Sequence, residues 1–291
     1  MKLGFGPITW NNEDLADLRA PVGYERVLDE IRASGFTGTE LGDGFPRDPA
    51  ELRAALASRG LEMPSAWCGL NLLDAGSEAA DLEHVERLAR LVHGVGGRYL
   101  NLAHQGTPER RARAGRAADP EMPRLDDAQW RQLALRCAAA GRVVRDHGLR
   151  AAFHPHAGTY VETAEEVEEL GRRVDPDLLG WCFDTGHAIY GRIDPVDFIR
   201  RHGPRIVHVH LKDVDGAVLE RLRAARAGWE EGLRSYVFAE LGEGLLDLAG
   251  VVAALRDVDY SGWLIVEQDT TRLEPIDAAR RARAALRALS L

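Results

Sequence analysis

Imidazole and carboxylate side chains recur in this chain just after runs of apolar residues. Four such runs end in the sequences FHPHAGT, FDTGH, HVHLKD and VEQD. They supply His154, His156, Asp184, His187, His208, His210, Lys212 and Glu267. Imidazole and carboxylate groups are the ligands that borderline and hard divalent ions prefer. One ligand from each of the four runs would be enough to hold such an ion.

The elements that must position these side chains follow a regular alternation. β-type apolar runs alternate with helical patterns over nearly the whole length. Strands are predicted at 2–8, 36–41, 61–67, 98–103, 149–154, 178–183, 205–211 and 262–267. Helices are predicted at 24–34, 48–59, 77–94, 126–147, 163–173, 194–202, 247–257 and 275–289. Eight strands alternating with eight helices in 291 residues predict a closed (β/α)8 TIM barrel in the α/β class.

The barrel prediction brings the four polar strand ends together. In a TIM barrel the carboxyl ends of all strands meet at one mouth, where active sites lie. A doubly wound open sheet is the main alternative, but no GxGxxG follows the first predicted strand. Two long connections, 104–125 and 212–246, also follow strand ends and are typical of lids and pocket walls. Without a linker or repeat, residues 1–291 are predicted to form one domain.

Each polar residue also has a simpler interpretation. A lone histidine near a strand end is more often a hydrogen-bonded structural residue than a ligand. Asp184 could cap the next helix, and Glu267 could pair with an arginine at the rim. Polar residues on four successive strand ends favour the joint interpretation, a metal site, over these separate ones.

Four residues in or at the ends of strands could meet a substrate. Trp10 and Trp67 are expected at the ends of the first and third strands, where an indole can stack on a sugar ring or pack at the rim. Glu40, at the end of the second strand, could bind hydroxyl groups or pair with an arginine. His208 is expected to contact the substrate next to His210.

Composition and charge narrow the class of protein. The net charge is −9, with 37 basic and 46 acidic residues, which argues against nucleic-acid binding. The three cysteines show no CxxC spacing, which favours a reducing, cytoplasmic location. No apolar run approaches the roughly 20 residues of a membrane helix, and no signal sequence is expected at the N-terminus. The expected partner is a small molecule, and a homodimer is compatible with the sequence.

Seven stretches of the chain resemble a known family. They are GPITWNNED (6–14), GTELGDGFPRDP (38–49), HPHAGTYVETAEEV (154–167), FDTGHAIYG (183–191), RIVHVHLKDV (205–214), LGEGLLD (241–247) and YSGWLIVEQD (260–269). They resemble the xylose-isomerase-like sugar isomerases, epimerases and dehydratases, and within that superfamily the inosose dehydratase branch. The combination of HxHxGT, DTGH and HVHxKD is fairly specific to this branch.

The resemblance implies a ligand set and an activity. It implies Asp184, His210 and Glu267 as metal ligands; the ligand after the fifth strand is usually a glutamate, and His154 stands there, as in the dehydratase branch. The implied ion is Mn²⁺ or Co²⁺, with Zn²⁺ or Mg²⁺ also compatible. The implied reaction is dehydration of 2-keto-myo-inositol to a trihydroxycyclohexane dione.

Catalytic roles can be assigned from the chemistry of a polyhydroxy ketone. A group near the metal takes the proton beside the carbonyl, and a second group protonates the departing hydroxyl. Glu267 is the expected base, and the expected acids are His156, His187 and Lys212.

Three other functions compete with the dehydratase. A metal-dependent ketose 3-epimerase or sugar isomerase shares the first half of the reaction and is the main alternative. An endonuclease for abasic DNA would share the barrel, but it would need a basic groove. A non-catalytic sugar-binding protein would need no metal.

Overall fold

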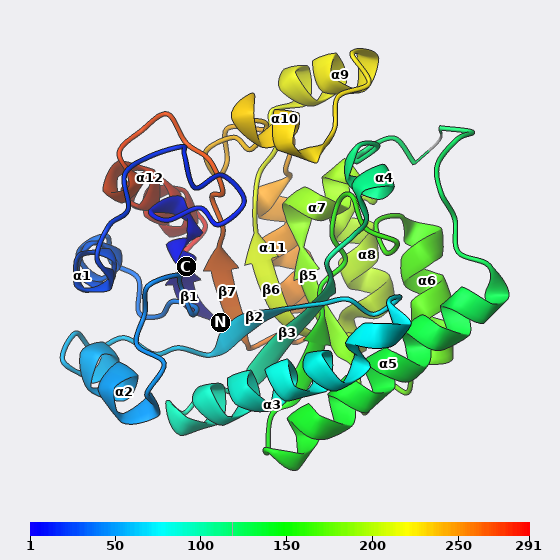
Figure 1. The fold of residues 1–291 in the computed structure, drawn as a ribbon. Helices are drawn as coiled ribbons and strands as arrows, with labels where there is room; N and C mark the ends of the chain where they lie inside the picture. The colour runs from blue at the N-terminus through cyan, green and yellow to red at the C-terminus, as the bar shows by residue number, and fades with distance from the viewer. Residues whose placement is uncertain (118) are drawn as a thin grey trace.

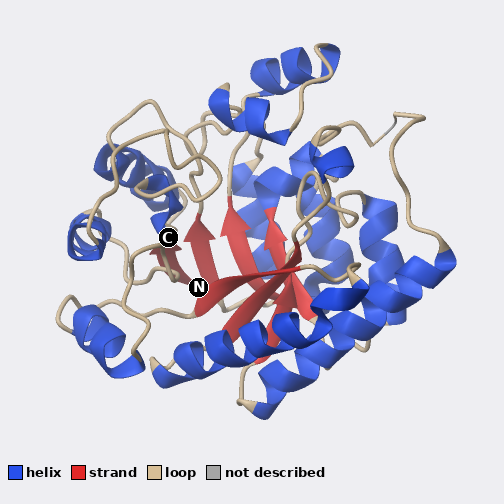
Figure 2. Cartoon of the chain, in the orientation of Figure 1, coloured by secondary structure: helices blue, strands red, loops and turns tan. Residues whose placement is uncertain are grey.

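A parallel sheet forms the centre of the computed structural model, which describes residues 1–117 and 119–291. Within these residues seven strands pair in the order β1-β7-β6-β5-β4-β3-β2. They are β1 (Lys2–Phe5), β2 (Ser65–Leu70), β3 (Tyr99–His104), β4 (Arg150–Phe153), β5 (Gly180–Asp184), β6 (Ile206–Leu211) and β7 (Trp263–Val266). The sheet curls, and helices surround its outer face (Figure 2).

One of the eight predicted strands, the second in chain order at 36–41, is not a regular strand among the described residues. It makes two isolated bridges, from Gly38 to Gly4 in β1 and from Gly38 to Glu62 ahead of β2. A Cβ on Gly38 would come within 2.3 Å of the Trp263 ring, so the indole lies directly against the glycine backbone. Residues 37–39 make ladder-type backbone hydrogen bonds with Leu3 and Phe5 on one side and with Glu62 on the other. The prediction of eight regular strands is therefore not confirmed.

All eight predicted helices are confirmed, with ends that lie within two residues of the prediction. They are α1 (Tyr24–Ala33), α2 (Pro49–Ala57), α3 (Glu78–Gly94), α5 (Asp127–Asp146), α6 (Ala164–Arg173), α8 (Pro195–His202), α11 (Leu248–Asp257) and α12 (Pro275–Ala288). Local capping explains the agreement: Thr163 and Glu166 form a capping box at the start of α6. None of the helices in the described part of the chain is long and apolar enough to cross a membrane.

Short helices stand in the connections at the strand ends. The connection 212–246, where the sequence favours a polar helical piece, contains α9 (Gly216–Ala224) and α10 (Trp229–Arg234) after β6; α4 (Pro108–Arg111) after β3 and α7 (Thr185–Tyr190) after β5 were not predicted. Figure 1 shows α9 and α10 beyond the carboxyl ends of the strands. Trp229 of α10 packs with Tyr190 and Phe238 in a second apolar cluster, separate from the main core. These connections therefore build the walls on the side where the polar strand ends meet.

A buried arginine fastens the connection 104–125. Arg110 of α4 is fully buried, and its guanidinium donates two 2.9 Å hydrogen bonds to the carboxylate of Glu166. Glu166 also accepts from the backbone N–H groups of Glu162 and Thr163, at the end of the segment that begins at His154. The ion pair thus joins two loops that border the strand ends.

We expect Arg110→Met to destabilise the protein by about 3–5 kcal/mol, because it leaves the Glu166 carboxylate buried without its cation. Urea unfolding of the variant measures this loss. Arg131→Met is the matched control, since Arg131 makes an exposed ion pair with Asp127 and should cost about 0–1 kcal/mol. Equal losses in the two variants would contradict the structural role of Arg110.

Candidate active site

A cavity of about 450 Å³ opens at the carboxyl ends of the strands. Its size is within the range of small-molecule sites, which are roughly 300–1,000 Å³. Seven of the residues selected from the sequence line it: Glu40, Trp67, His154, His156, His187, Lys212 and Glu267. Asp184 and His210 are buried at its base, in contact with these residues.

Four side chains from neighbouring strand ends converge in this cavity. His154 follows β4, Asp184 ends β5, His210 belongs to β6 and Glu267 follows β7. Each offers one ligand atom, and the four atoms all lie within 4.8 Å of one another. Ligands bonded to one ion at about 2.0–2.3 Å are separated by roughly 3–4.5 Å, so the spacing fits a single ion.

Several of these atoms are buried without a hydrogen-bond partner among the described residues. They are both ring nitrogens of His154, Oδ2 of Asp184 and Nδ1 of His210. The separation of 3.6 Å between Nε2 of His154 and Oδ2 of Asp184 is too long for a hydrogen bond. A buried polar atom left unpaired costs about 1–3 kcal/mol, and a bound cation would remove that cost. The residues present therefore fit a divalent ion.

Asp184 combines the two roles that the sequence left open. Its Oδ1 accepts a 2.8 Å hydrogen bond from the backbone N–H of His187 and caps α7. Its Oδ2 points instead toward Nε2 of His154 and Nδ1 of His210, at 3.6 and 3.8 Å. One carboxylate can therefore cap a helix and still offer an oxygen to an ion.

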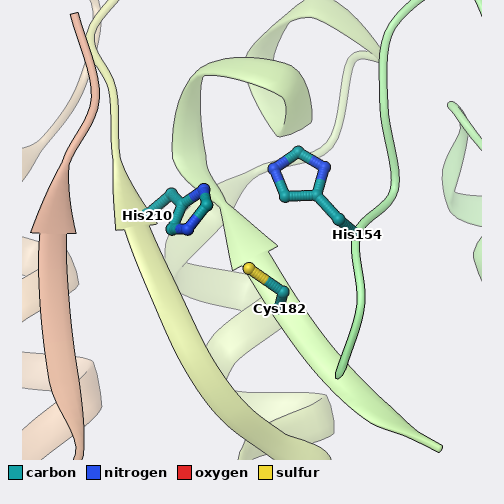
Figure 3. Close-up of side chains that lie close together, drawn as sticks. All are labelled: His154, Cys182 and His210. Atoms are coloured by element: carbon teal, nitrogen blue, oxygen red, sulfur yellow. The ribbon is translucent and has the colours of Figure 1, made fainter. Parts of the chain in front are cut away.

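A cysteine lies one layer below the ligand cluster. Cys182 and Asp184 are two residues apart on β5 and point to the same side of the strand. Figure 3 shows the Cys182 sulfur near the rings of His154 and His210. Burial raises the pKa of the Cys182 thiol to about 12. The group with Cys182 offers three ligand atoms, whereas the group with Asp184 and Glu267 offers four, so the carboxylates are the better partners for the two histidines.

Lys212 balances the negative charge of the site. Its Nζ lies 3.0 Å from Oε2 of Glu267 and 2.9 Å from Oδ1 of Asp269. Burial opposes ionisation of Asp184, but the charge of Lys212 3.5 Å away and the nearby histidines hold the pKa of Asp184 well below its usual range. The same carboxylates overcome the effect of burial on Lys212 and raise the pKa of its ammonium well above its usual value.

Hydrogen bonds to Ala157 hold two stacked histidines. The rings of His156 and His187 have centroids 3.8 Å apart. The backbone N–H of Ala157 donates to Nδ1 of His187, and Nε2 of the same ring lies 3.2 Å from the Lys212 ammonium, which can only donate, so both nitrogens of His187 face donors. Nδ1 of His156 lies 2.7 Å from the carbonyl of Ala157 and must carry its proton, which leaves a lone pair on Nε2. Burial lowers the pKa of His156 to about 3, so this ring is neutral.

Three other residues were predicted to meet a substrate, and only one of them, Trp67, lines the cavity. Trp67 lies in the cavity wall, with its ring 5.1 Å from that of His154. Trp10 lies in the core against Phe5 and does not line the cavity, so it has the packing role. His208 is fully buried below the cavity and cannot reach a ligand there.

Glu40 has partners that the sequence did not indicate. It contacts no arginine among the described residues; its Oε1 lies 3.0 Å from Nε2 of His208 and 3.2 Å from Nε2 of His210. Burial opposes its ionisation, but the charge of His210 and the hydrogen bonds from both histidines hold the pKa of Glu40 well below its usual range.

Asp269 and His104 are two of the cavity residues that were not predicted from the sequence. Asp269 stands two residues after Glu267 and contacts Lys212, and the sequence VEQD contained this signal. His104 ends β3 and lines the cavity; its Nδ1 accepts a 2.7 Å hydrogen bond from the N–H of Gly106. His104 stands at a strand end like the other site histidines, and this position in the sequence was the feature that could have identified it as a site residue.

Known proteins resemble this chain in sequence. Residues 28–289 match the family described as xylose isomerase-like TIM barrel. Inosose dehydratase from Geobacillus kaustophilus is 34% identical over 284 residues, which cover 97% of this chain and 92% of that protein. The chain belongs to the xylose isomerase-like TIM-barrel family, and within that family to the inosose dehydratase branch.

Solved structures with this fold include enzymes of two reaction types. The 3-keto-D-glucoside 4-epimerase from E. coli has a TM-score of 0.72 and 20% identity, covering 99% of both chains. The probable 3-DHS dehydratase from Bacillus anthracis has a TM-score of 0.73 and 18% identity, also over 99% of both chains. At these identities the likeness concerns the fold.

Proposed function

We propose that the protein is a divalent-metal-dependent hydro-lyase that converts 2-keto-myo-inositol to a trihydroxycyclohexane dione. Membership of the inosose dehydratase branch makes it a lyase that dehydrates a keto-sugar-like substrate. The observation that carries the proposal is the buried cluster of four ligands beside His156, His187 and Lys212 in one cavity.

The proposed ion is Mn²⁺ or Co²⁺, held by His154, Asp184, His210 and Glu267. Two imidazoles and two carboxylates make a mixed set of nitrogen and oxygen ligands, which suits these ions and is also compatible with Zn²⁺ or Mg²⁺. A bound ion would supply Lewis-acid polarisation of the substrate carbonyl, which makes the neighbouring C–H more acidic.

The chain's own residues divide the two proton transfers between them. Glu267 and His156 are the candidate bases: Glu267 offers a carboxylate held ionised beside Lys212, and His156, expected from the sequence to be an acid, offers the lone pair on Nε2. The base takes the proton from the carbon beside the carbonyl. Nε2 of His187 lies 3.2 Å from the Lys212 ammonium, so the ammonium can protonate the β-hydroxyl directly or through the His187 ring.

The loss of water needs no oxidant or reductant, because the electron pairs of the bonds broken and formed balance. The electron pair of the broken C–H bond forms a C=C bond, and the C–O bond to the protonated hydroxyl breaks to release water. The remaining enol moves its proton from oxygen to carbon and becomes the dione.

A ketose 3-epimerase or sugar isomerase is the second candidate. The observation that favours it is the fold shared with the 3-keto-D-glucoside 4-epimerase. Such an enzyme would return the proton to carbon and would leave the β-hydroxyl in place.

The direct test incubates the Mn²⁺-loaded protein with 2-keto-myo-inositol in deuterated water and follows the product mass. We expect loss of one water, and we expect chelation of the metal to abolish it. Deuterium uptake without water loss would favour the epimerase or isomerase. Neither change, with metal bound, would overturn the proposed activity.

We expect His187→Ala to slow water loss by about 10²–10⁴-fold, because the variant lacks the proposed acid. Deuterium exchange beside the carbonyl should continue, because Glu267 and His156 are unchanged. His93→Ala, on the exposed end of α3, is the control and should leave both rates unchanged. Equal losses of exchange and dehydration in His187→Ala would contradict the role of His187 as acid.

A further inference from the structure

Glu40 is a buried carboxylate whose hydrogen bonds concentrate on one oxygen. Its Oε1 accepts from Oγ of Ser65 at 2.5 Å and from Nδ2 of Asn101 at 2.8 Å. Nε2 of His208 and Nε2 of His210 face the same oxygen, at 3.0 and 3.2 Å. These partners come from β2, β3 and β6, so Glu40 is held in place from several strands.

The two ring nitrogens of His210 face different carboxylates. Its Nε2 faces Oε1 of Glu40, while its Nδ1 lies 3.3 Å from Oε1 of Glu267 and 3.8 Å from Oδ2 of Asp184. A histidine that binds an ion gives up one of its two ring protons, and because an ionised carboxylate only accepts hydrogen bonds, the proton that stays is the one on Nε2, against Glu40. The lone pair is then on Nδ1, directed at the other ligand atoms.

We propose that Glu40 is a positioning residue that orients His210 and selects the tautomer able to bind the ion. This inference rests on the proposed metal site at His154, Asp184, His210 and Glu267. Metal-binding histidines commonly donate their second N–H to a carboxylate, which holds the ring orientation and makes the ligand more basic. Glu40 therefore acts through His210, from the side of the ring opposite the ion.

A second ion is the competing interpretation of the same residues. Glu40, His208 and His210 also offer ligand atoms within 4.8 Å of one another. However, the hydroxyl of Ser65 and the amide of Asn101 already donate to Oε1 of Glu40. A cation bound to Oε1 would meet the hydrogen atoms of these donors, whereas the N–H of His210 is a further donor to the negative oxygen, so the surroundings of Oε1 suit hydrogen-bond donors and not a cation.

The test compares Glu40→Gln with the unchanged chain. Both full-length proteins are stripped with a chelator, and Mn²⁺ binding is titrated calorimetrically. We expect one ion per chain in both, and an affinity about 10–100-fold lower in the variant, because the amide lacks the charge that holds the Nε2 proton. Glu40→Asp keeps the charge but shortens the side chain, so its affinity should lie between the two.

Asp81→Asn is the matched control for loss of a buried carboxylate. Asp81 pairs with Arg136 at 2.8 Å on the helical layer and does not line the cavity. We expect this variant to lose thermal stability while keeping the Mn²⁺ affinity within about twofold, since no metal ligand contacts it. A similar loss of affinity in Asp81→Asn would show that Glu40 acts only through general stability, and would overturn the proposal.

The possible outcomes separate this inference from the proposed function. If the unchanged chain binds no Mn²⁺, the proposed metal site itself fails. If it binds one ion and Glu40→Gln binds it equally well, the positioning role of Glu40 is wrong. Two ions in the unchanged chain and one in the variant would make Glu40 a ligand and also overturn the proposal. If Glu40→Gln does not fold, an unchanged affinity in Glu40→Asp serves as the overturning result.

Discussion

Burial of the Asp184 carboxylate at the end of β5 constrains the whole site. One oxygen is held by the N–H of His187 at the start of α7, and the other is left buried among His154, His210 and Lys212. A carboxylate at the end of a buried strand is costly unless cations or hydrogen bonds surround it. The surrounding histidines and lysine are therefore needed to stabilise the buried Asp184 carboxylate, in addition to any role in the proposed reaction.

Charge is arranged in layers along the strands. The upper layer holds the four proposed ligands and Lys212, and the layer below it holds Cys182 and His208; Glu40 lines the cavity and also contacts His208. Cys182 and His208 are too deeply buried to touch a ligand in the cavity directly. The lower layer can define the orientation and protonation of the groups above it, and His210 is the residue shared by both layers.

The same arrangement explains why related folds serve different reactions. In the proposed reaction, removal of the proton beside the carbonyl uses the cation site and a base, which a dehydratase and an epimerase would share. The fate of the resulting enolate would then depend on whether an acid faces the β-hydroxyl. His156 and His187 both contact backbone groups of Ala157, so small changes in this loop would alter the second half of the proposed reaction.

Short windows of the sequence are enough to predict the alternation of strands and helices and the chemical types at four strand ends. Apolar periodicity, the capping box at Thr163 and polar residues after apolar runs are all local features. Folding of the whole chain is needed to place Trp10 in the core and Trp67 in the cavity wall, and to bring Glu40 to His210 rather than to an arginine.

Local sequence patterns also fail to predict that segment 36–41 is irregular. Trp263, far away in the chain, packs on Gly38 there, and the segment forms only isolated bridges among the described residues. Each of these contacts joins residues far apart in the chain. Their outcome depends on how the complete sheet curls and packs, and no short stretch of sequence encodes that.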